Sequence, residues 1–200
     1  MSNSFRTTNS TGLINKDKKI NFTFNGTIYH GYEGDTLASA LIANGVHLVG
    51  RSFKYHRPRG FLGVGVEEPN AMVQLHDGNK SEPNIIATEV ELVEGLKAKS
   101  QNCWPSVQFD IGEINNVLNR FFPAGFYYKT FMWPKSFWMK IYEPFIRKAA
   151  GMGKAPLLPD PDRYEHNYEH CDVLVVGSGP SGLALSLIHI SEPTRRLEIA

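Results

Sequence analysis

A glycine-rich turn directly behind a short apolar run constrains the fold of this 200-residue chain more than any other feature. The run, Asp172-Val173-Leu174-Val175-Val176, is rich in β-branched residues, which is typical of a buried parallel strand. Gly177-Ser178-Gly179-Pro180-Ser181-Gly182 follows at once, and a helix can begin at Leu183-Ala184. A strand, a GxGxxG turn and a helix predict the start of an α/β Rossmann-type domain over residues 171–184.

The three glycines of this turn have separate physical roles in a dinucleotide site. Gly177 permits the tight turn, Gly179 lets the backbone approach a pyrophosphate, and Gly182 lets the helix pack closely on the strand. The whole run from Gly177 to Gly182 is therefore the predicted cofactor-binding segment, for NAD or alternatively FAD. A glycine turn that binds no ligand is the competing interpretation.

Residues 19–96 have the pattern of a small α+β domain. Ile20, Phe22 and Phe24 alternate with polar neighbours, Asn25-Gly26 predicts a hairpin turn, and Ile28 to Tyr32 can return as a second strand. Leu37 to Ile42 then predict a helix, capped by Asp35 or Thr36 and ended by Gly45. Val73 and Leu75, then Val90 and Leu92, are the expected later strands. This order predicts a β-grasp, the fold of plant-type ferredoxins.

The remaining segments read as leader and connector. Met1 to about residue 18 is polar and lacks the apolar core of a secretory signal, which predicts a flexible leader and a cytoplasmic protein. Residues 97–170 predict an irregular connector whose aromatic stretch, Phe121 to Phe145, packs on neighbouring domains or subunits. A membrane-surface role for that stretch is disfavoured because its prolines break any long amphipathic helix. No run is long enough to span a bilayer.

Two further clusters leave alternatives open. Arg51 to Gly60 mixes basic and aromatic residues, as nucleic-acid sites do, but it is one short loop in a chain of net charge +1. Contact with a neighbouring domain is therefore the favoured interpretation. His166, His170 and Cys171 are metal-ligand types without an evident fourth partner, so a solvated linker is favoured there and no metal site is predicted.

Several motifs together resemble the alpha subunits of heterotetrameric sarcosine oxidases. The resemblance rests on Gly31 to Leu41, Arg51 to Gly60, Ala124 to Pro134, Asp160 to Glu165, and Cys171 to Val176 leading into the glycine turn. It covers about residues 18 to 184 and indicates that the chain is the N-terminal part of such a subunit. Opine and hydrogen-cyanide-forming dehydrogenases share the general plan.

The resemblance implies oxidative demethylation of sarcosine to glycine, with oxygen reduced to hydrogen peroxide and the one-carbon unit passed to tetrahydrofolate. It implies NAD in this subunit, FAD and FMN in the complex through the partner subunit, and beta, gamma and delta subunits as partners. No residue here resembles a catalytic acid, base or nucleophile. The alternatives are an FAD-dependent opine or cyanide-forming dehydrogenase subunit and a non-enzymatic β-grasp docking module.

Relatives with this plan hold a [2Fe–2S] cluster through a C-x4-C-x2-C loop. The corresponding positions here are Leu62, Glu67 and Asn70, none of which is a thiolate. A single Cys103 cannot hold the cluster, so we expect a β-grasp without iron and sulfide.

The run from Leu185 to Arg195 resembles a translated reading frame of a transposase sequencing adapter. The family resemblance stops at Ala184, and Pro193 would fall in or at the end of the helix, where an interior proline costs about 3 kcal/mol. We therefore expect residues 185–200 to be an artefact and the fragment to be inactive by itself.

Overall fold

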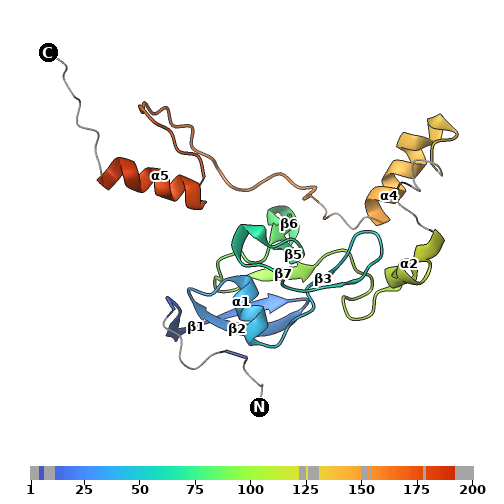
Figure 1. The fold of residues 1–200 in the computed structure, drawn as a ribbon, viewed down its shortest axis with the longest axis horizontal. Coiled ribbons are helices and arrows are strands. Elements are labelled where there is room, and N and C mark those ends of the chain that lie inside the picture. The colour runs from blue at the N-terminus through green and yellow to red at the C-terminus, as the bar shows by residue number, and fades with distance from the viewer. Residues whose placement is uncertain are drawn as a thin grey trace. The chain divides into compact units, whose positions relative to one another are not determined.

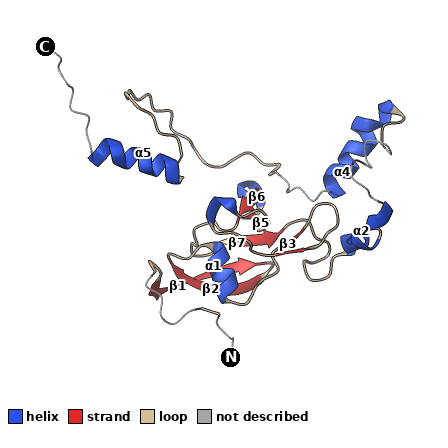
Figure 2. Ribbon diagram, viewed as in Figure 1, coloured by secondary structure: helices blue, strands red, loops and turns tan. Residues whose placement is uncertain are grey.

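The computed structural model describes residues 5–6, 12–121, 125, 131–149, 153, 155–177 and 179–191. The chain divides into two compact units, Met1–Pro161 and Asp162–Ala200. Figure 1 shows the elements of both units along the chain, and Figure 2 shows the distribution of helix and strand. No helix in these residues is long and apolar enough to cross a membrane.

The first unit contains a five-stranded mixed sheet in the order β2-β1-β7-β5-β6. Its strands are β1 (Asn15–Phe24), β2 (Thr27–Glu33), β5 (Met72–Leu75), β6 (Glu82–Ile86) and β7 (Lys97–Ser100). The central pair β1 and β7 is parallel, whereas the other pairs are antiparallel. A separate two-stranded sheet joins β3 (Gly50–Arg51) to β4 (Pro58–Arg59).

The β1–β2 hairpin confirms the sequence prediction. Asn25 and Gly26 both have positive φ, at 51° and 81°, as a two-residue hairpin turn of this hand requires. Ile20, Phe22 and Phe24 point to one face and are 7%, 1% and 2% exposed, because alternate residues of a strand share a face.

Helix α1 (Leu37–Ala43) covers that face of the sheet (Figure 1). Thr36 is its N-cap and forms a reciprocal capping box with Ser39, which settles the choice between Asp35 and Thr36. Gly45, with φ of 77°, follows the last turn and donates its N–H to the Ile42 carbonyl, as predicted. Leu37, Ala40 and Leu41 have no exposed surface, so the helix and sheet enclose one hydrophobic core.

The later strands differ from the prediction. Val73 and Leu75 lie in β5, but Val90 and Leu92 belong to an irregular segment with one isolated bridge, from Glu91 to Thr36. The remaining places in the sheet are taken by β6 and β7. Strand β7 lies beyond the expected domain boundary at residue 96. The sequence pattern did not predict this strand, because its Lys-Ala-Lys-Ser sequence buries only one residue, Ala98, in the core.

The expected leader, residues 1–18, also differs. Strand β1 begins at Asn15, and Phe5 donates its N–H to the Ala43 carbonyl at 3.0 Å. The Arg6 guanidinium forms a bidentate pair with Asp35, at 3.0 and 2.7 Å. These two described leader residues therefore dock on both ends of α1, which the polar composition did not reveal.

The described part of the connector, expected to be irregular, contains short helices and helical turns. Helices α2 (Ile114–Val117) and α4 (Glu143–Ala149) are separated by 3₁₀ turns and a π-helical turn. The turns between these helices are η4 (Asn119–Phe121), η5 (Lys135–Phe137) and η6 (Trp138–Tyr142), and η3 (Ile111–Glu113) precedes α2. Turns η1 (Gly65–Glu67) and η2 (Gly78–Lys80) lie within the β-grasp. Trp133 and Phe121 remain 83% and 74% exposed, so their expected burial against neighbouring domains or subunits stays a prediction.

In the second unit, the strand expected over Asp172–Val176 is not formed. Val173, Leu174 and Val176 are 57%, 76% and 87% exposed, because the described part of this unit offers no neighbouring strand to pair with. The expected helix is present as α5 (Pro180–Ser191) and begins three residues earlier than Leu183. Residues 192–200, including Pro193, lie outside the described residues, so the adapter origin of 185–200 stays a prediction.

Candidate functional site

The predicted cofactor-binding segment lies between Val176 and the first turns of α5. Gly177 has φ of 107°, a conformation that L side chains rarely adopt, so the chain can reverse there. Pro180 opens the helix, where its fixed φ and missing N–H carry no penalty. The Leu183 N–H donates to the Gly179 carbonyl at 3.0 Å and closes the first turn.

The other two glycines differ in the space around them. A Cβ at Gly182 would lie 2.4 Å from the Gly177 carbonyl oxygen, so only glycine lets the helix approach the turn this closely. A Cβ at Gly179 would meet nothing within 4 Å, so that backbone faces open space. The space at each glycine leaves room for its predicted role, and dinucleotide binding itself stays a prediction.

The remaining predicted site residues surround this opening. Pro180 and Ser181 are exposed on the first turn of α5, and Ser178 lies outside the described residues. Because the first N–H groups of a helix have no partner within the helix, those of Ser181 and Gly182 can donate to an anion. Among the described residues of the turn, Gly177 and Gly179 to Gly182, none has a carboxyl, imidazole, amine or thiol side chain.

The loop between β4 and β5 does not fit an iron–sulfur cluster. Leu62 is 76% exposed, Glu67 accepts the Val64 N–H at 3.0 Å, and Asn70 has no thiol. Cys103 is partly buried; burial, aided by the negative charge of Asp110, raises the pKa of its thiol. Among the described residues no group of three or more His, Cys, Asp or Glu could hold a metal ion.

One carboxylate occupies the centre of this loop. Glu68 is 2% exposed, and its two oxygens accept four backbone N–H groups. The N–H nitrogens of Leu62 and Gly63 each lie 2.6 Å from Oε2. Those of Asn70 and Ala71 lie 2.7 and 3.1 Å from Oε1. Burial acts to raise the pKa of Glu68, but these four donors outweigh it and hold the pKa below its usual range.

The basic and aromatic loop from Arg51 to Gly60 is tied to the connector. Arg51 is 7% exposed and donates to the carbonyls of Val107, Gln108 and His56, at 2.8, 3.2 and 3.1 Å. It also pairs with Glu113 at 3.2 Å. Because its guanidinium is engaged in this way, Arg51 is a structural cation and not part of a nucleic-acid surface. These contacts lie within one unit, so the favoured interpretation, contact with a neighbouring domain, stays a prediction.

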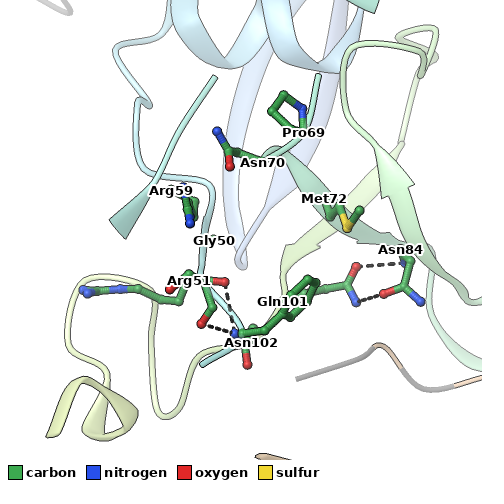
Figure 3. Close-up of a pocket in the computed structure, with 11 residues that line it drawn as sticks. Gly50, Arg51, Arg59, Pro69, Asn70, Met72, Asn84, Gln101 and Asn102 are labelled. Carbon is green, nitrogen blue, oxygen red and sulfur yellow. Dashed lines mark hydrogen bonds between the residues drawn. The ribbon is translucent and has the colours of Figure 1, made fainter. Parts of the chain in front are cut away.

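A small cavity lies beside Arg51 (Figure 3). Its volume is about 110 Å³, and Asn102 donates there to the Arg51 and Ser52 carbonyls, at 3.0 and 2.6 Å. Small-molecule pockets usually measure about 300 Å³ or more. This cavity can therefore hold a few waters but not a cofactor.

Comparison with known proteins identifies relatives of the whole segment. Residues 17–103 match the family described as "2Fe-2S iron-sulfur cluster binding domain", which fits a β-grasp with a mixed sheet. The chain is 60% identical over 176 residues to the sarcosine oxidase subunit alpha of Rhizobium meliloti (strain 1021), a match covering 88% of this chain and 18% of the relative. It is 31% identical over 174 residues to that of Corynebacterium sp. (strain U-96), covering 86% and 13%.

Among solved structures, L-proline dehydrogenase from P. horikoshii matches with a TM-score of 0.33 and 24% identity, over 44% of this chain and 16% of that chain. We draw no structural conclusion from a score this low. The sequence similarity confirms the predicted resemblance to sarcosine oxidase alpha subunits. The chain spans less than a fifth of the length of the two sarcosine oxidase relatives described above.

Sequence reasoning did not find Glu68 or the buried role of Arg51. Glu68 lies beside Glu67 in a loop with Gly63 and Gly65, and two acids next to several loop amides are the one available signal. Arg51 carries no such signal, because its acceptors in the connector, the Val107 and Gln108 carbonyls, lie more than 50 residues away.

Proposed function

We propose that this chain is part of an oxidoreductase subunit of the sarcosine oxidase type. The observation that carries the proposal is 60% identity over 88% of the chain to a sarcosine oxidase subunit alpha. The corresponding reaction is oxidative demethylation of sarcosine to glycine, with reduction of oxygen to hydrogen peroxide and transfer of the one-carbon unit to tetrahydrofolate. The expected setting is a cytoplasmic complex with beta, gamma and delta subunits, in which the partner beta subunit carries the flavins FAD and FMN.

Within this function, we propose that the turn from Gly177 to Gly182 binds the pyrophosphate of NAD. Support comes from the positive φ of Gly177, the open space at Gly179 and the close approach of Gly182 to the Gly177 carbonyl. The nicotinamide group would supply hydride chemistry. The residues of this chain supply backbone donors and a helix N-terminus, and FAD is the alternative ligand for the same turn.

The competing dehydrogenase function is less well supported. An FAD-dependent opine or cyanide-forming dehydrogenase subunit with a [2Fe–2S] cluster needs thiolates where this loop has Leu62, Glu67 and Asn70. A docking module made of the β-grasp alone does not account for the glycine turn. The first alternative therefore lacks its cluster ligands, and the second leaves the glycine turn unexplained.

The test is Gly179→Val in the intact subunit within its complex. A valine side chain would occupy the space through which the pyrophosphate must approach, so bound NAD should fall by about tenfold or more. Bound nucleotide is released by acid, identified and quantified by chromatography. Gly12→Val is the matched control, because a Cβ at Gly12 also meets nothing within 4 Å.

Equal nucleotide content in Gly179→Val and Gly12→Val would show that the motif is only a turn. Loss of FAD in place of NAD would keep the site and correct its ligand. Absence of sarcosine oxidation in the unaltered complex would overturn the function independently of the nucleotide.

A further inference from the structure

The β4–β5 loop has the donor arrangement of an anion site, although its thiolate positions are lost. Four backbone N–H groups converge on one buried point from both ends of the loop, Leu62-Gly63 and Asn70-Ala71. Successive amides that point to one centre form an anion-binding concavity. The four N–H groups therefore need an acceptor at this point, since a buried N–H without an acceptor is costly, and an anion suits their arrangement best.

In cluster-binding relatives the same loop surrounds an iron–sulfur cluster, whose sulfurs accept hydrogen bonds from the protein. In this chain the convergent donors meet the Glu68 carboxylate, which is supplied by the loop itself. The side chain is 2% exposed, so its oxygens are shielded from water and rely on these four donors.

We propose that the Glu68 carboxylate replaces the iron–sulfur cluster as the anion that organises this loop. The loop keeps a folded conformation without metal, and the β-grasp is retained as a structural module that carries no electrons. The inference goes beyond the proposed dinucleotide site and does not depend on it, because the carboxylate and its four donors all lie between residues 62 and 71.

Two other contacts hold the loop around this carboxylate. The Thr88 hydroxyl donates to the Gly65 carbonyl at 2.7 Å, which anchors the loop tip. A Cβ at Gly63 would lie 3.3 Å from the Glu68 Cα and from the Glu67 Cγ, so the backbone is closely packed there. The neighbouring Glu67 accepts only one of the loop amides, that of Val64, and it is exposed. It therefore provides a matched control.

The test is amide hydrogen exchange of the 200-residue chain and its variants Glu68→Gln and Glu67→Gln, resolved residue by residue by NMR. In Glu68→Gln the amides of Leu62, Gly63, Asn70 and Ala71 should exchange about tenfold faster or more, because the acceptor loses its charge. Glu67→Gln should leave these four amides at their wild-type rates. Wild-type exchange of the four amides in Glu68→Gln would overturn the proposal.

A measurement on the unaltered chain covers the case in which Glu68→Gln does not fold. Scalar couplings across the hydrogen bonds should connect the Leu62 and Asn70 amide nitrogens to the Glu68 carboxyl carbon. These couplings should persist after dialysis against a metal chelator. Their absence, or their disappearance on chelation, would refute the assignment of Glu68 as the organising anion.

Discussion

Asp35 offers the sharpest test of how the β-grasp is stabilised, and Asp35→Asn is the perturbation. Asp35 is 1% exposed at the start of α1, and its carboxylate accepts from the Arg6 guanidinium at 3.0 and 2.7 Å. It also accepts from the Ser39 hydroxyl at 2.7 Å and the Tyr32 N–H at 2.9 Å. One side chain thus ties the leader, the end of β2 and the first turn of α1 together.

The substitution removes the charge and turns one acceptor into a donor facing Arg6 and other donors. Breaking a buried ion pair from one side costs about 3–5 kcal/mol, because the remaining charge stays desolvated. The Arg6 side chain keeps 15% exposure and can move toward water, so the lower end applies. We expect a loss of about 3 kcal/mol in the free energy of unfolding at pH 7.

The same carboxylate predicts a pH dependence. Burial raises the pKa of Asp35, but the hydrogen bonds from Arg6, Ser39 and Tyr32 outweigh it and lower the pKa overall. The stabilisation is therefore fully present above the unfolded pKa, about 4, and is lost as the pH falls through the lower folded value. In Asp35→Asn this part of the acid-induced loss of stability should be missing.

Urea unfolding followed by far-ultraviolet circular dichroism at several pH values measures both effects. Asp77→Asn is the control, because Asp77 pairs with Lys99 on the exposed surface, where its charge is screened. A stability loss in Asp35→Asn below about 1 kcal/mol, the range of surface pairs, would refute the reasoning. If Asp35→Asn lost as much stability on acidification as the unaltered chain, the argument from the pKa of Asp35 would be refuted separately.

The remaining predictions concern the same domain. Reconstitution of the 200-residue chain with iron and sulfide should produce no visible charge-transfer bands, because the loop lacks thiolates; stoichiometric cluster binding would contradict this. Gly31→Ala should destabilise by about 1–3 kcal/mol, because its Cβ would lie 2.4 Å from Leu92 Cδ2, and thermal unfolding measures the loss. Gly50→Ala is the matched control, since its Cβ meets only atoms 3.6 Å away or farther; equal effects would show that the Leu92 contact does not matter.

The parts of the fold predicted correctly are those specified by near neighbours in the sequence. The Asn25-Gly26 hairpin, the Thr36 cap and the Gly45 terminus depend on residues within a few positions of each other. The parallel pairing of β1 with β7 joins residues more than 70 positions apart, with Phe24 opposite Ala98. Nothing in the polar sequence of β7 indicates that pairing.

The buried charges escaped prediction for a related reason. Glu68 is satisfied by backbone amides, which every sequence supplies equally, so its side chain has no partner residue that a pattern could reveal. Arg51 binds carbonyls of the connector, and by composition its loop resembles an exposed basic patch. A charged residue is therefore reliably predicted to be exposed only where the fold places no hydrogen-bond partner beside its side chain.

The glycine turn separates local from non-local information within a single motif. The positive φ of Gly177 and the close approach of Gly182 to the Gly177 carbonyl involve residues at most five positions apart, and both are formed although Asp172–Val176 is not a strand. The apolar side chains of that run become buried only when other strands lie beside them, because a parallel strand is covered on both faces. The conformation of the turn is thus specified by the motif itself, whereas the surface that would shield a bound dinucleotide from water depends on neighbouring strands.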